Sequence, residues 1–224
     1  MMFPDADTPP RPAMTLRDLQ SAYPMVNIGQ ALNLLPSHRF VYVTNPKAGC
    51  SSSKLMLQRL HLGQPDYEPT VRGIHDLSIL PLPRDLGWPS VMAMIGGAAF
   101  IATFVRDPVR RAVSAYADKI QGTPEDKGFD AFLDMVEAQG PADADPHWRA
   151  QHINIMMGSI RYDMIGRVES FASDWARIIA AADLPSMDVP HSNHTGSQQA
   201  LNIRPDQIAR LRRIYAEDIE AFGY

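Results

Sequence analysis

The stretch VYVTNPKAGCSSSK, residues 41–54, passes from an apolar run through a loop of small residues toward a helical pattern. Its first part belongs to RFVYVT, residues 39–44, a run of aromatic and β-branched residues that predicts a short buried strand. After the loop, residues 54–62 (KLMLQRLHL) have the apolar spacing of a helix. Small residues between a strand and a helix let successive backbone N–H groups converge on an anion, which the helix dipole also attracts. The sequence therefore predicts an anion-binding loop.

Lys47 stands at the tip of this loop, where its ammonium can contact the anionic group that is transferred. Its place before Gly49 departs from the Gly-x-x-x-x-Gly-Lys-Ser/Thr spacing of a Walker loop, which weighs against an ATP or GTP hydrolase. No activating partner is visible for Cys50, so we expect a small filler there and not a nucleophile. The residues expected to bind the anion through backbone N–H or hydroxyl groups are Ala48, Gly49, Cys50, Ser51, Ser52 and Ser53.

A second anion site is predicted from FIATFVRDPVRRAVSAY, residues 100–116. The apolar run 98–105 predicts a buried strand that delivers Arg106 at its carboxyl end, where ligands bind in open α/β sheets. Asp107 is expected to cap the helix that follows, and Ser114 lies about two turns along that helix on a similar face. The Arg106 guanidinium and the Ser114 hydroxyl suit a phosphate group. Two more arginines are expected on the solvated face of this helix, where one can assist phosphate binding: Arg110 and Arg111.

The remaining pattern alternates strands with helices, which predicts a single α/β domain with a central, mainly parallel sheet flanked by helices. The proline-rich segment 65–89 has weak periodicity and is expected to be irregular. Residues 1–36 are predicted to form an N-terminal tail with a short helix, and residues 37–224 the main domain. The other elements expected are a strand at 162–166 and helices at 15–23, 109–120, 129–137, 147–157, 171–182 and 205–222.

Composition narrows the function classes. The chain of 224 residues is 45% hydrophobic and 21% charged, as globular proteins are, and its net charge of −4 weighs against a nucleic-acid binder. Its one cysteine, Cys50, allows no internal disulfide and suits a reducing, cytoplasmic setting. The first residues lack a secretory signal pattern. The apolar stretch 91–105 is shorter than the roughly 20 residues that span a bilayer, so no membrane anchor is expected.

The two anion motifs together resemble a known family. PKAGCSSSK is similar to the 5′-phosphosulfate loop, and FVRDPVRRAVSAY to the 3′-phosphate motif, of Golgi-type carbohydrate sulfotransferases. This group includes the chondroitin and dermatan sulfotransferases, the related glucuronyl enzymes and the heparan-sulfate uronyl sulfotransferases. ADPHWRAQ, YDMIGRVESFASDW and YAEDIEAFGY are supporting likenesses, so the resemblance extends from about residue 39 to the last residue. The chain departs from vertebrate members in lacking a membrane stem and lumenal cysteines, which favours a soluble, bacterial-type member.

The resemblance implies a fold related to the P-loop nucleotide kinases and a donor, 3′-phosphoadenosine 5′-phosphosulfate (PAPS). The reaction implied moves a sulfuryl group to a hydroxyl of a carbohydrate or glycolipid acceptor, leaves adenosine 3′,5′-bisphosphate and requires no metal. By position, Lys47 would contact the bridging oxygen and the sulfuryl group, and residues 49–52 would hold the 5′-phosphate. Arg106 and Ser114 would hold the 3′-phosphate. The loop HSNH, in which a metal site is not expected, would place two residues near the nucleotide: Ser192 and Asn193.

The acceptor hydroxyl needs a general base, and histidine suits that task near neutral pH. His75, in GIHDL, is the first candidate, because the uronyl sulfotransferases carry a base histidine in the matching interval. His147, in DPHWRAQ, is the second, and both can instead be structural. An acceptor wall is expected from Trp148, Arg149 and Gln151, with Arg149 attracting an acidic sugar. Two other readings stay open: a P-loop-like kinase that uses ATP, and a non-catalytic protein that binds a nucleotide or glycan.

Overall fold

A four-stranded sheet, in the order β1-β2-β3-β4, forms the centre of the protein. The structure is a computed structural model and describes residues 14–76, 79–189 and 202–224. Strand β1 pairs with β2 antiparallel, whereas β2 with β3 and β3 with β4 are parallel. The predicted α/β domain with a mainly parallel sheet is therefore confirmed. The strands are β1 (Leu32–Leu35), β2 (Phe40–Val43), β3 (Phe100–Val105) and β4 (Met164–Arg167).

The register of the two central strands sets the place of the site. Val41 pairs with Ile101 and Tyr42 with Ala102, so β2 and β3 run side by side in the same direction. The segment that begins at Thr44 therefore leaves the sheet beside Arg106, at the carboxyl edge. Ligands of parallel sheets bind at this edge.

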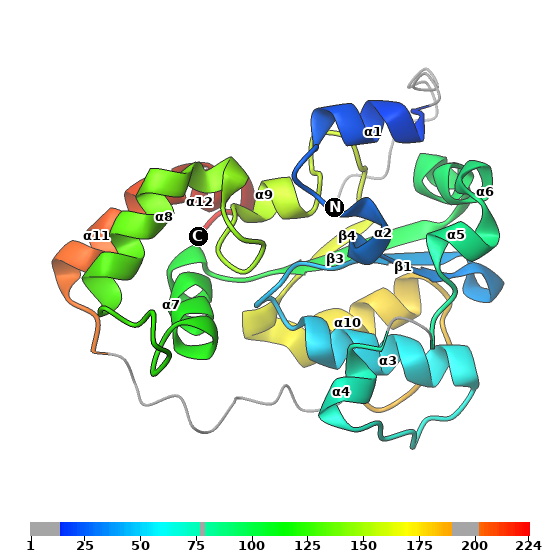
Figure 1. The fold of residues 1–224 in the computed structure, drawn as a ribbon. Coiled ribbons are helices and arrows are strands. Elements are labelled where there is room, and N and C mark those ends of the chain that lie inside the picture. The colour runs from blue at the N-terminus through cyan, green and yellow to red at the C-terminus, as the bar shows by residue number, and fades with distance from the viewer. Residues whose placement is uncertain (1–13, 77–78, 190–201) are drawn as a thin grey trace.

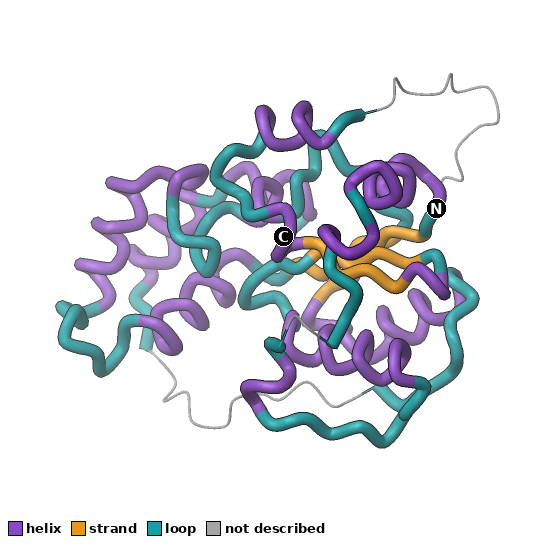
Figure 2. Tube along the Cα trace, turned by 45° about the vertical axis from the view of Figure 1, so that its right-hand side comes forward, coloured by secondary structure: helices purple, strands orange, loops and turns teal. Residues whose placement is uncertain are grey.

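Helices cover both faces of the sheet because its side chains alternate between two apolar cores (Figures 1 and 2). Val41 and Val43 join the core under α1 (Leu16–Ala22), α2 (Ile28–Ala31) and α6 (Trp88–Ala93). Phe40 and Tyr42 point to the opposite core. The helices of that second face are α3 (Cys50–Leu62) and α10 (Phe171–Ala181).

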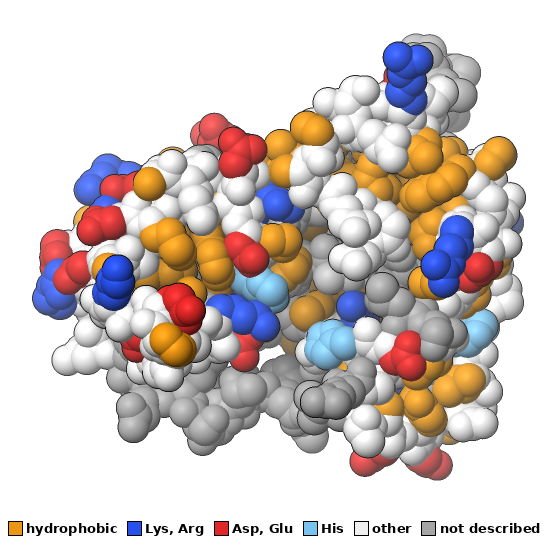
Figure 3. All heavy atoms as spheres, viewed as in Figure 1, with side chains coloured by type: hydrophobic (Ala, Val, Ile, Leu, Met, Phe, Trp, Pro, Cys, Tyr) orange, Lys and Arg blue, Asp and Glu red, His pale blue; other side chains and the backbone are white. Residues whose placement is uncertain are grey.

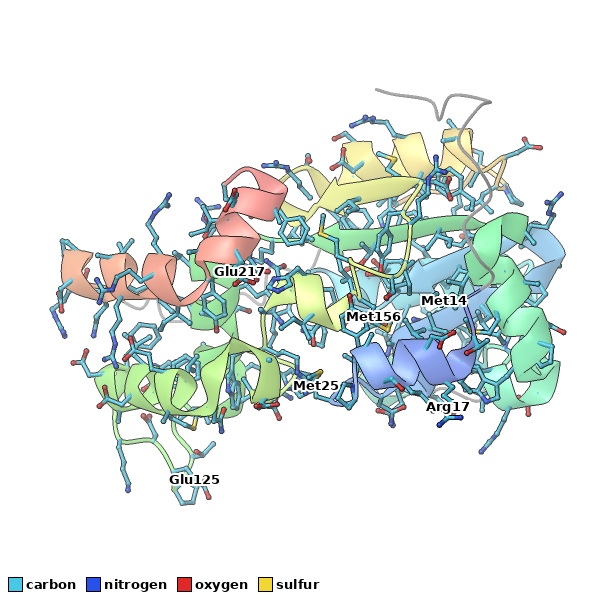
Figure 4. All side chains as sticks on the ribbon, turned by 90° about the horizontal axis from the view of Figure 1, so that it is seen from above. Met14, Arg17, Met25, Glu125, Met156 and Glu217 are labelled. Carbon is cyan, nitrogen blue, oxygen red and sulfur yellow. The ribbon has the colours of Figure 1, made fainter. Side chains whose placement is uncertain are left out.

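A third core holds a group of helices beyond the carboxyl edge of the sheet, which we call the helical lobe (Figure 4). The Phe132 ring contacts the rings of Tyr116 and Trp148 in this core, and Tyr215 is buried there too. Strand β3 leads directly into the lobe, so the lobe faces the anion loop (Figure 1). Its helices are α7 (Pro108–Lys119), α8 (Phe129–Asp143), α9 (Gln151–Asn154), α11 (Pro205–Ile214) and α12 (Ala216–Phe222).

Local signals in the sequence located several helix starts correctly. Thr15 caps α1 in a capping box with Asp18, and Asp107 caps α7 by accepting a hydrogen bond from the Arg110 N–H at 2.7 Å. Both caps satisfy donors that the first helical turn leaves free. Helix α3 begins at Cys50, four residues earlier than its apolar pattern indicates, because the small loop residues continue into the helix.

Other expectations were wrong in detail. Segment 65–89 contains the short helices α4 (Val71–Ile74) and α5 (Pro83–Leu86), and β1 lies within the stretch taken for a tail. The strand predicted at 98–105 is confirmed as β3, which begins at Phe100, and the residues before it form α6 and a π-helical turn (Met94–Ala98), in which Gly97 has a φ of 121° that favours glycine. The helix expected at 147–157 is reduced to α9. The division at residue 36 stays a prediction.

The predicted C-terminal helix is divided at Tyr215. The Tyr215 hydroxyl donates to the Trp148 carbonyl at 2.6 Å and its ring is buried, so the backbone turns there and separates α11 from α12. None of the helices within residues 14–76, 79–189 and 202–224 is long and apolar enough to cross a bilayer.

Candidate functional site

The loop between β2 and α3 has the geometry of an anion site. Lys47 has a φ of 66°, and Gly49, the N-cap of α3, has a φ of 74°, so the chain turns sharply into the helix. Among the described residues, no side chain caps α3. The N–H groups of its first turn, from Cys50 onward, are therefore free for an anion at the positive end of the helix dipole.

Glycine is required at position 49. A Cβ there would lie 2.8 Å from Cε2 of Phe171, closer than real Cβ contacts come, and the left-handed backbone also disfavours a side chain. Phe171 belongs to the aromatic cluster under the sheet, with its ring 4.7 Å from that of Phe104. The loop thus packs directly on the core, which fixes the position of the first turn of α3.

Arg106 brings the second anion motif against this loop. Its Nη1 donates to the Lys47 carbonyl oxygen at 3.4 Å, although 59 residues separate the two. Gln151 holds the backbone here, since its Oε1 accepts from the Arg106 N–H at 3.0 Å and its Nε2 donates to the Arg106 carbonyl at 2.8 Å. The Asn45 side chain donates to the same Gln151 oxygen at 3.0 Å. Buried Gln151, expected in an acceptor wall, instead ties together the ends of β2 and β3.

Arg111 fixes the same loop from α7. It was expected on a solvated face, but it is 1% exposed, and its guanidinium donates to three carbonyl oxygens. Nε bonds to Pro46 at 2.9 Å, Nη1 to Arg149 at 2.7 Å and Nη2 to Pro146 at 3.0 Å. Burying a guanidinium is costly unless its donors are satisfied. The three carbonyl oxygens satisfy these donors, and the bond to Pro46 fixes the position of the residue before Lys47.

Lys47 makes an ion pair that the sequence did not indicate. Its Nζ lies 2.6 Å from Oδ2 of Asp118, and Lys119 Nζ lies 3.2 Å from the same oxygen. Burial lowers the pKa of the Lys47 ammonium, and Asp118 opposes that effect. Burial alone would raise the pKa of the Asp118 carboxyl, but its contacts with Lys47 and Lys119 lower it overall. The sequence signal that could have pointed to Asp118 is its spacing: it lies four residues after Ser114 and therefore on the same face of α7.

His75 reaches the first turn of α3. Its Nε2 lies 3.2 Å from Ser51 Oγ. Partial burial lowers the pKa of the His75 imidazole, and the nearby charges of Lys54 and Lys119 lower it further, so the ring is kept neutral. Figure 3 shows Lys, Arg and His side chains gathered in the hollow between the helical lobe and the sheet. His75 therefore lies at the start of α3, where the charges of Lys54 and Lys119 act on it.

The acceptor-side residues are arranged differently from the prediction. His147 Nδ1 lies 2.6 Å from Asp145 Oδ1, in the segment that Arg111 ties to the loop. Trp148 is buried, with its Nε1 donating to Gln139 at 2.9 Å. Arg149 is buried as well, and its Nε donates to the Ala144 carbonyl at 3.1 Å. Trp148 and Arg149 pack within the helical lobe, and a role for them in binding an acceptor stays a prediction.

Two expected donors of the loop face inward. Ser53 is buried, and its N–H donates to the Gly49 carbonyl at 3.0 Å inside α3. The Ala48 N–H donates to the Asn45 carbonyl at 3.1 Å, so it closes the turn. Ser114 is buried in α7, two turns beyond Arg106. Four residues discussed from the sequence lie outside the described residues: His191, Ser192, Asn193 and His194.

Fold and site together define an α/β protein in which a loop with the geometry of an anion site meets Arg106 at the carboxyl edge of the parallel strands. Residues 30–224 match the model of the Sulfotransferase family, so the chain belongs to that family. No curated protein and no solved structure was found to match it. In the described part of the chain, no group of three or more His, Cys, Asp or Glu side chains is placed to hold a metal ion.

Proposed function

We propose that this protein transfers a sulfuryl group from PAPS to a hydroxyl group of a carbohydrate or glycolipid acceptor. Its family supports sulfuryl transfer, and the motifs around Lys47 and Arg106 supply the two anion sites that this donor needs. PAPS carries a phosphosulfate at its 5′ end and a phosphate at its 3′ end. The nucleotide product of the reaction is adenosine 3′,5′-bisphosphate.

The observation that carries the proposal is the contact between these two motifs. Arg106 Nη1 and the Lys47 carbonyl oxygen are 3.4 Å apart, so the arginine stands directly beside the loop. A mononucleotide with phosphates at both ends requires two anion sites that lie within one nucleotide of each other. ATP has no 3′-phosphate, so a kinase that uses it needs no site for that group.

The reaction is an in-line displacement. An acceptor oxygen attacks sulfur, the bond from sulfur to the bridging oxygen breaks, and the bisphosphate leaves with the electron pair. The chain stabilises the charge that develops on the leaving phosphate through the Lys47 ammonium and the N–H groups at the start of α3. Arg111 and Gln151 hold these groups in place before the donor arrives, which limits the reorganisation needed at the moment of transfer.

A base near the acceptor hydroxyl takes its proton. We assign this role to His75, because its ring contacts Ser51 in the first turn of α3 and a lowered pKa keeps it neutral. A neutral imidazole accepts a proton, whereas an imidazolium does not. His147 is the alternative, since its pairing with Asp145 would orient the ring.

We also propose that the protein works in the cytoplasm, because its single cysteine suits a reducing compartment.

Calorimetric titration with adenosine 3′,5′-bisphosphate, adenosine 5′-phosphate and ATP, with and without magnesium, tests the donor. We expect tight binding of the bisphosphate that does not depend on magnesium, and weak binding of both other nucleotides. A preference for ATP with magnesium would contradict the proposal and favour a kinase. Tight bisphosphate binding without sulfation of any hydroxyl acceptor, assayed with PAPS against a panel of sugars and glycolipids, would favour a non-catalytic binding protein.

A further inference from the structure

The start of helix α9 is capped by a side chain from another helix. Its own N-cap is Ala150, whose methyl group has no acceptor for the free N–H groups of the first turn. Asp218 of α12 supplies the acceptors: Oδ2 bonds to the Gln151 N–H at 2.7 Å, and Oδ1 bonds to the His152 N–H at 3.0 Å. A carboxylate from the last helix of the chain therefore takes the place of a local cap.

The Asp218 carboxylate is completely buried, at 0% exposure. Burying a carboxylate costs free energy unless hydrogen-bond donors surround it. His152 supplies a third donor, because its Nδ1 lies 2.7 Å from Asp218 Oδ1. The bond to Asp218 raises the pKa of the His152 imidazole despite partial burial, and Glu217, 3.2 Å from its Nε2, acts in the same direction. A protonated His152 compensates the buried negative charge.

Helix α12, which carries Asp218, is fixed to the rest of the protein near both of its ends. At its start, the Tyr215 hydroxyl donates to the Trp148 carbonyl at 2.6 Å. In its last turn, the Phe222 carbonyl accepts a hydrogen bond from the guanidinium of Arg167, the final residue of β4. Asp218 is therefore held in a defined position relative to the sheet.

Gln151 connects this position to the second anion motif. Its N–H bonds to Asp218, while its side chain bonds to both backbone polar groups of Arg106, at 3.0 and 2.8 Å. The anion loop has a support of its own in Arg111, whose Nε holds the Pro46 carbonyl at 2.9 Å. A shift of Gln151 should therefore displace Arg106 more than it displaces the loop.

We propose that Asp218 is a positioning residue for the donor: by capping α9 it fixes Gln151, and Gln151 fixes Arg106 where the 3′-phosphate is to bind. This assignment rests on the proposed function. Asp218 acts through Gln151 and does not touch the nucleotide. Its effect on binding is therefore opposite in sign to that of its charge, because a carboxylate near an anion site would by itself repel the ligand.

Two nucleotides that differ only in the 3′-phosphate test this role. Asp218→Asn keeps the size of the side chain and removes its charge. We expect it to weaken binding of adenosine 3′,5′-bisphosphate about three- to tenfold, less than loss of the Arg106 guanidinium itself, and to leave binding of adenosine 5′-phosphate unchanged. Calorimetric titration measures both. Glu217→Gln, at the exposed neighbouring carboxylate, is the matched control for charge and should alter neither affinity.

A local cap tests whether capping is the cause. Ala150→Ser places a hydroxyl oxygen at the N-cap of α9, where it can accept from the first turn. We expect this substitution to restore part of the bisphosphate affinity that Asp218→Asn loses. No recovery, although Ala150→Ser alone binds as the wild type does, would show that Asp218 does not act through the start of α9.

The remaining outcomes also overturn the assignment. Equal losses for both nucleotides would show general damage to the fold, and unchanged or tighter bisphosphate binding would show that Asp218 does not position Arg106. Asp218→Ser, which keeps one acceptor oxygen, replaces the asparagine variant should that fail to fold, and is judged by the same comparison. Wild-type protein that does not prefer the bisphosphate to adenosine 5′-phosphate would overturn the proposed function itself, and the role of Asp218 with it.

Discussion

The ammonium of Lys47 is paired with the carboxylate of Asp118 at 2.6 Å. The cation that we assign to the leaving phosphate must therefore exchange one anionic partner for another. Lys119 holds the same carboxylate at 3.2 Å and can retain it after Lys47 moves to the donor. Asp118 is 47% exposed although Lys47 is only 16% exposed, so water solvates the carboxylate once it is released, which lowers the cost of the exchange.

Asp118→Asn is expected to tighten binding of adenosine 3′,5′-bisphosphate about two- to fivefold, because it removes a carboxylate that competes for Lys47. Calorimetric titration measures the change. Glu125→Gln is the matched control for loss of one negative charge, since Glu125 lies on the exposed loop between α7 and α8 (Figure 4). Unchanged affinity together with loss of turnover would mean that Asp118 takes part in the transfer and does not merely compete with the donor.

Substitution of Lys47 should mainly lower turnover, whereas substitution of Arg106 should mainly weaken nucleotide binding. Lys47→Ala is expected to lower kcat roughly 100-fold or more, as removal of a group that stabilises developing charge does. Its bisphosphate binding should weaken only about two- to fivefold, because Lys47 exchanges the Asp118 carboxylate for the phosphate. Arg106→Ala should weaken the bisphosphate about tenfold or more and leave adenosine 5′-phosphate, which lacks the 3′ group, unaffected. Single-turnover kinetics and titration of both nucleotides give the comparison. The reverse pattern would mean that the two roles are interchanged.

His75 should set the acidic limb of the pH profile. Its base form is the neutral ring, so activity falls as the pH drops through its pKa. Partial burial, together with the charges of Lys54 and Lys119, lowers that pKa, which places the limb below the usual histidine value of about 6.5. His75→Gln should abolish most turnover, whereas His147→Gln keeps both activity and limb. Loss of the limb in the His147 variant alone would identify His147 as the base.

The sequence predicted what local pattern can specify. The strand, loop and helix around Lys47, the position of Arg106 and the Asp107 cap all depend on residues close together in the chain. The burial of Arg111 could not be predicted, because its three acceptors lie 35 to 65 residues away and carry no side-chain signal. Asp118 was missed, and Gln151 was expected in an acceptor wall, for the same reason. Their contacts form only when the helical lobe packs against the sheet.

Arg111→Met should lower stability and weaken the site together. It removes the Arg111 donor from the Pro46 and Arg149 carbonyls, whereas the Pro146 carbonyl keeps its bond from Asn154 Nδ2 at 2.9 Å. Each buried group left unsatisfied costs about 1–3 kcal/mol. Denaturant unfolding and bisphosphate titration measure the two effects, and Arg111→Lys, which keeps part of the donor set, should recover part of each. Arg110→Met, at the exposed neighbour, is the control. Full nucleotide affinity in folded Arg111→Met would show that the loop holds its shape without this arginine.

Alanine substitutions at the two glycines that flank α3 distinguish the cost of backbone strain from the cost of a steric clash. Gly49 and Gly63 both have left-handed φ angles, 74° and 63°, but only a Cβ at Gly49 meets a neighbour, 2.8 Å from Phe171. Gly63→Ala should therefore cost about 1 kcal/mol in the free energy of unfolding, from backbone strain alone.

Gly49→Ala should cost clearly more than Gly63→Ala, and it alone should weaken binding of the bisphosphate, because the first turn of α3 must move away from the Phe171 ring. Adding Phe171→Leu to Gly49→Ala makes room for the methyl group and should restore part of the lost affinity, which a cost of strain alone would not allow. Equal effects of the two alanine substitutions on stability and binding would mean that the ring yields easily and that the contact with the core does not position the loop.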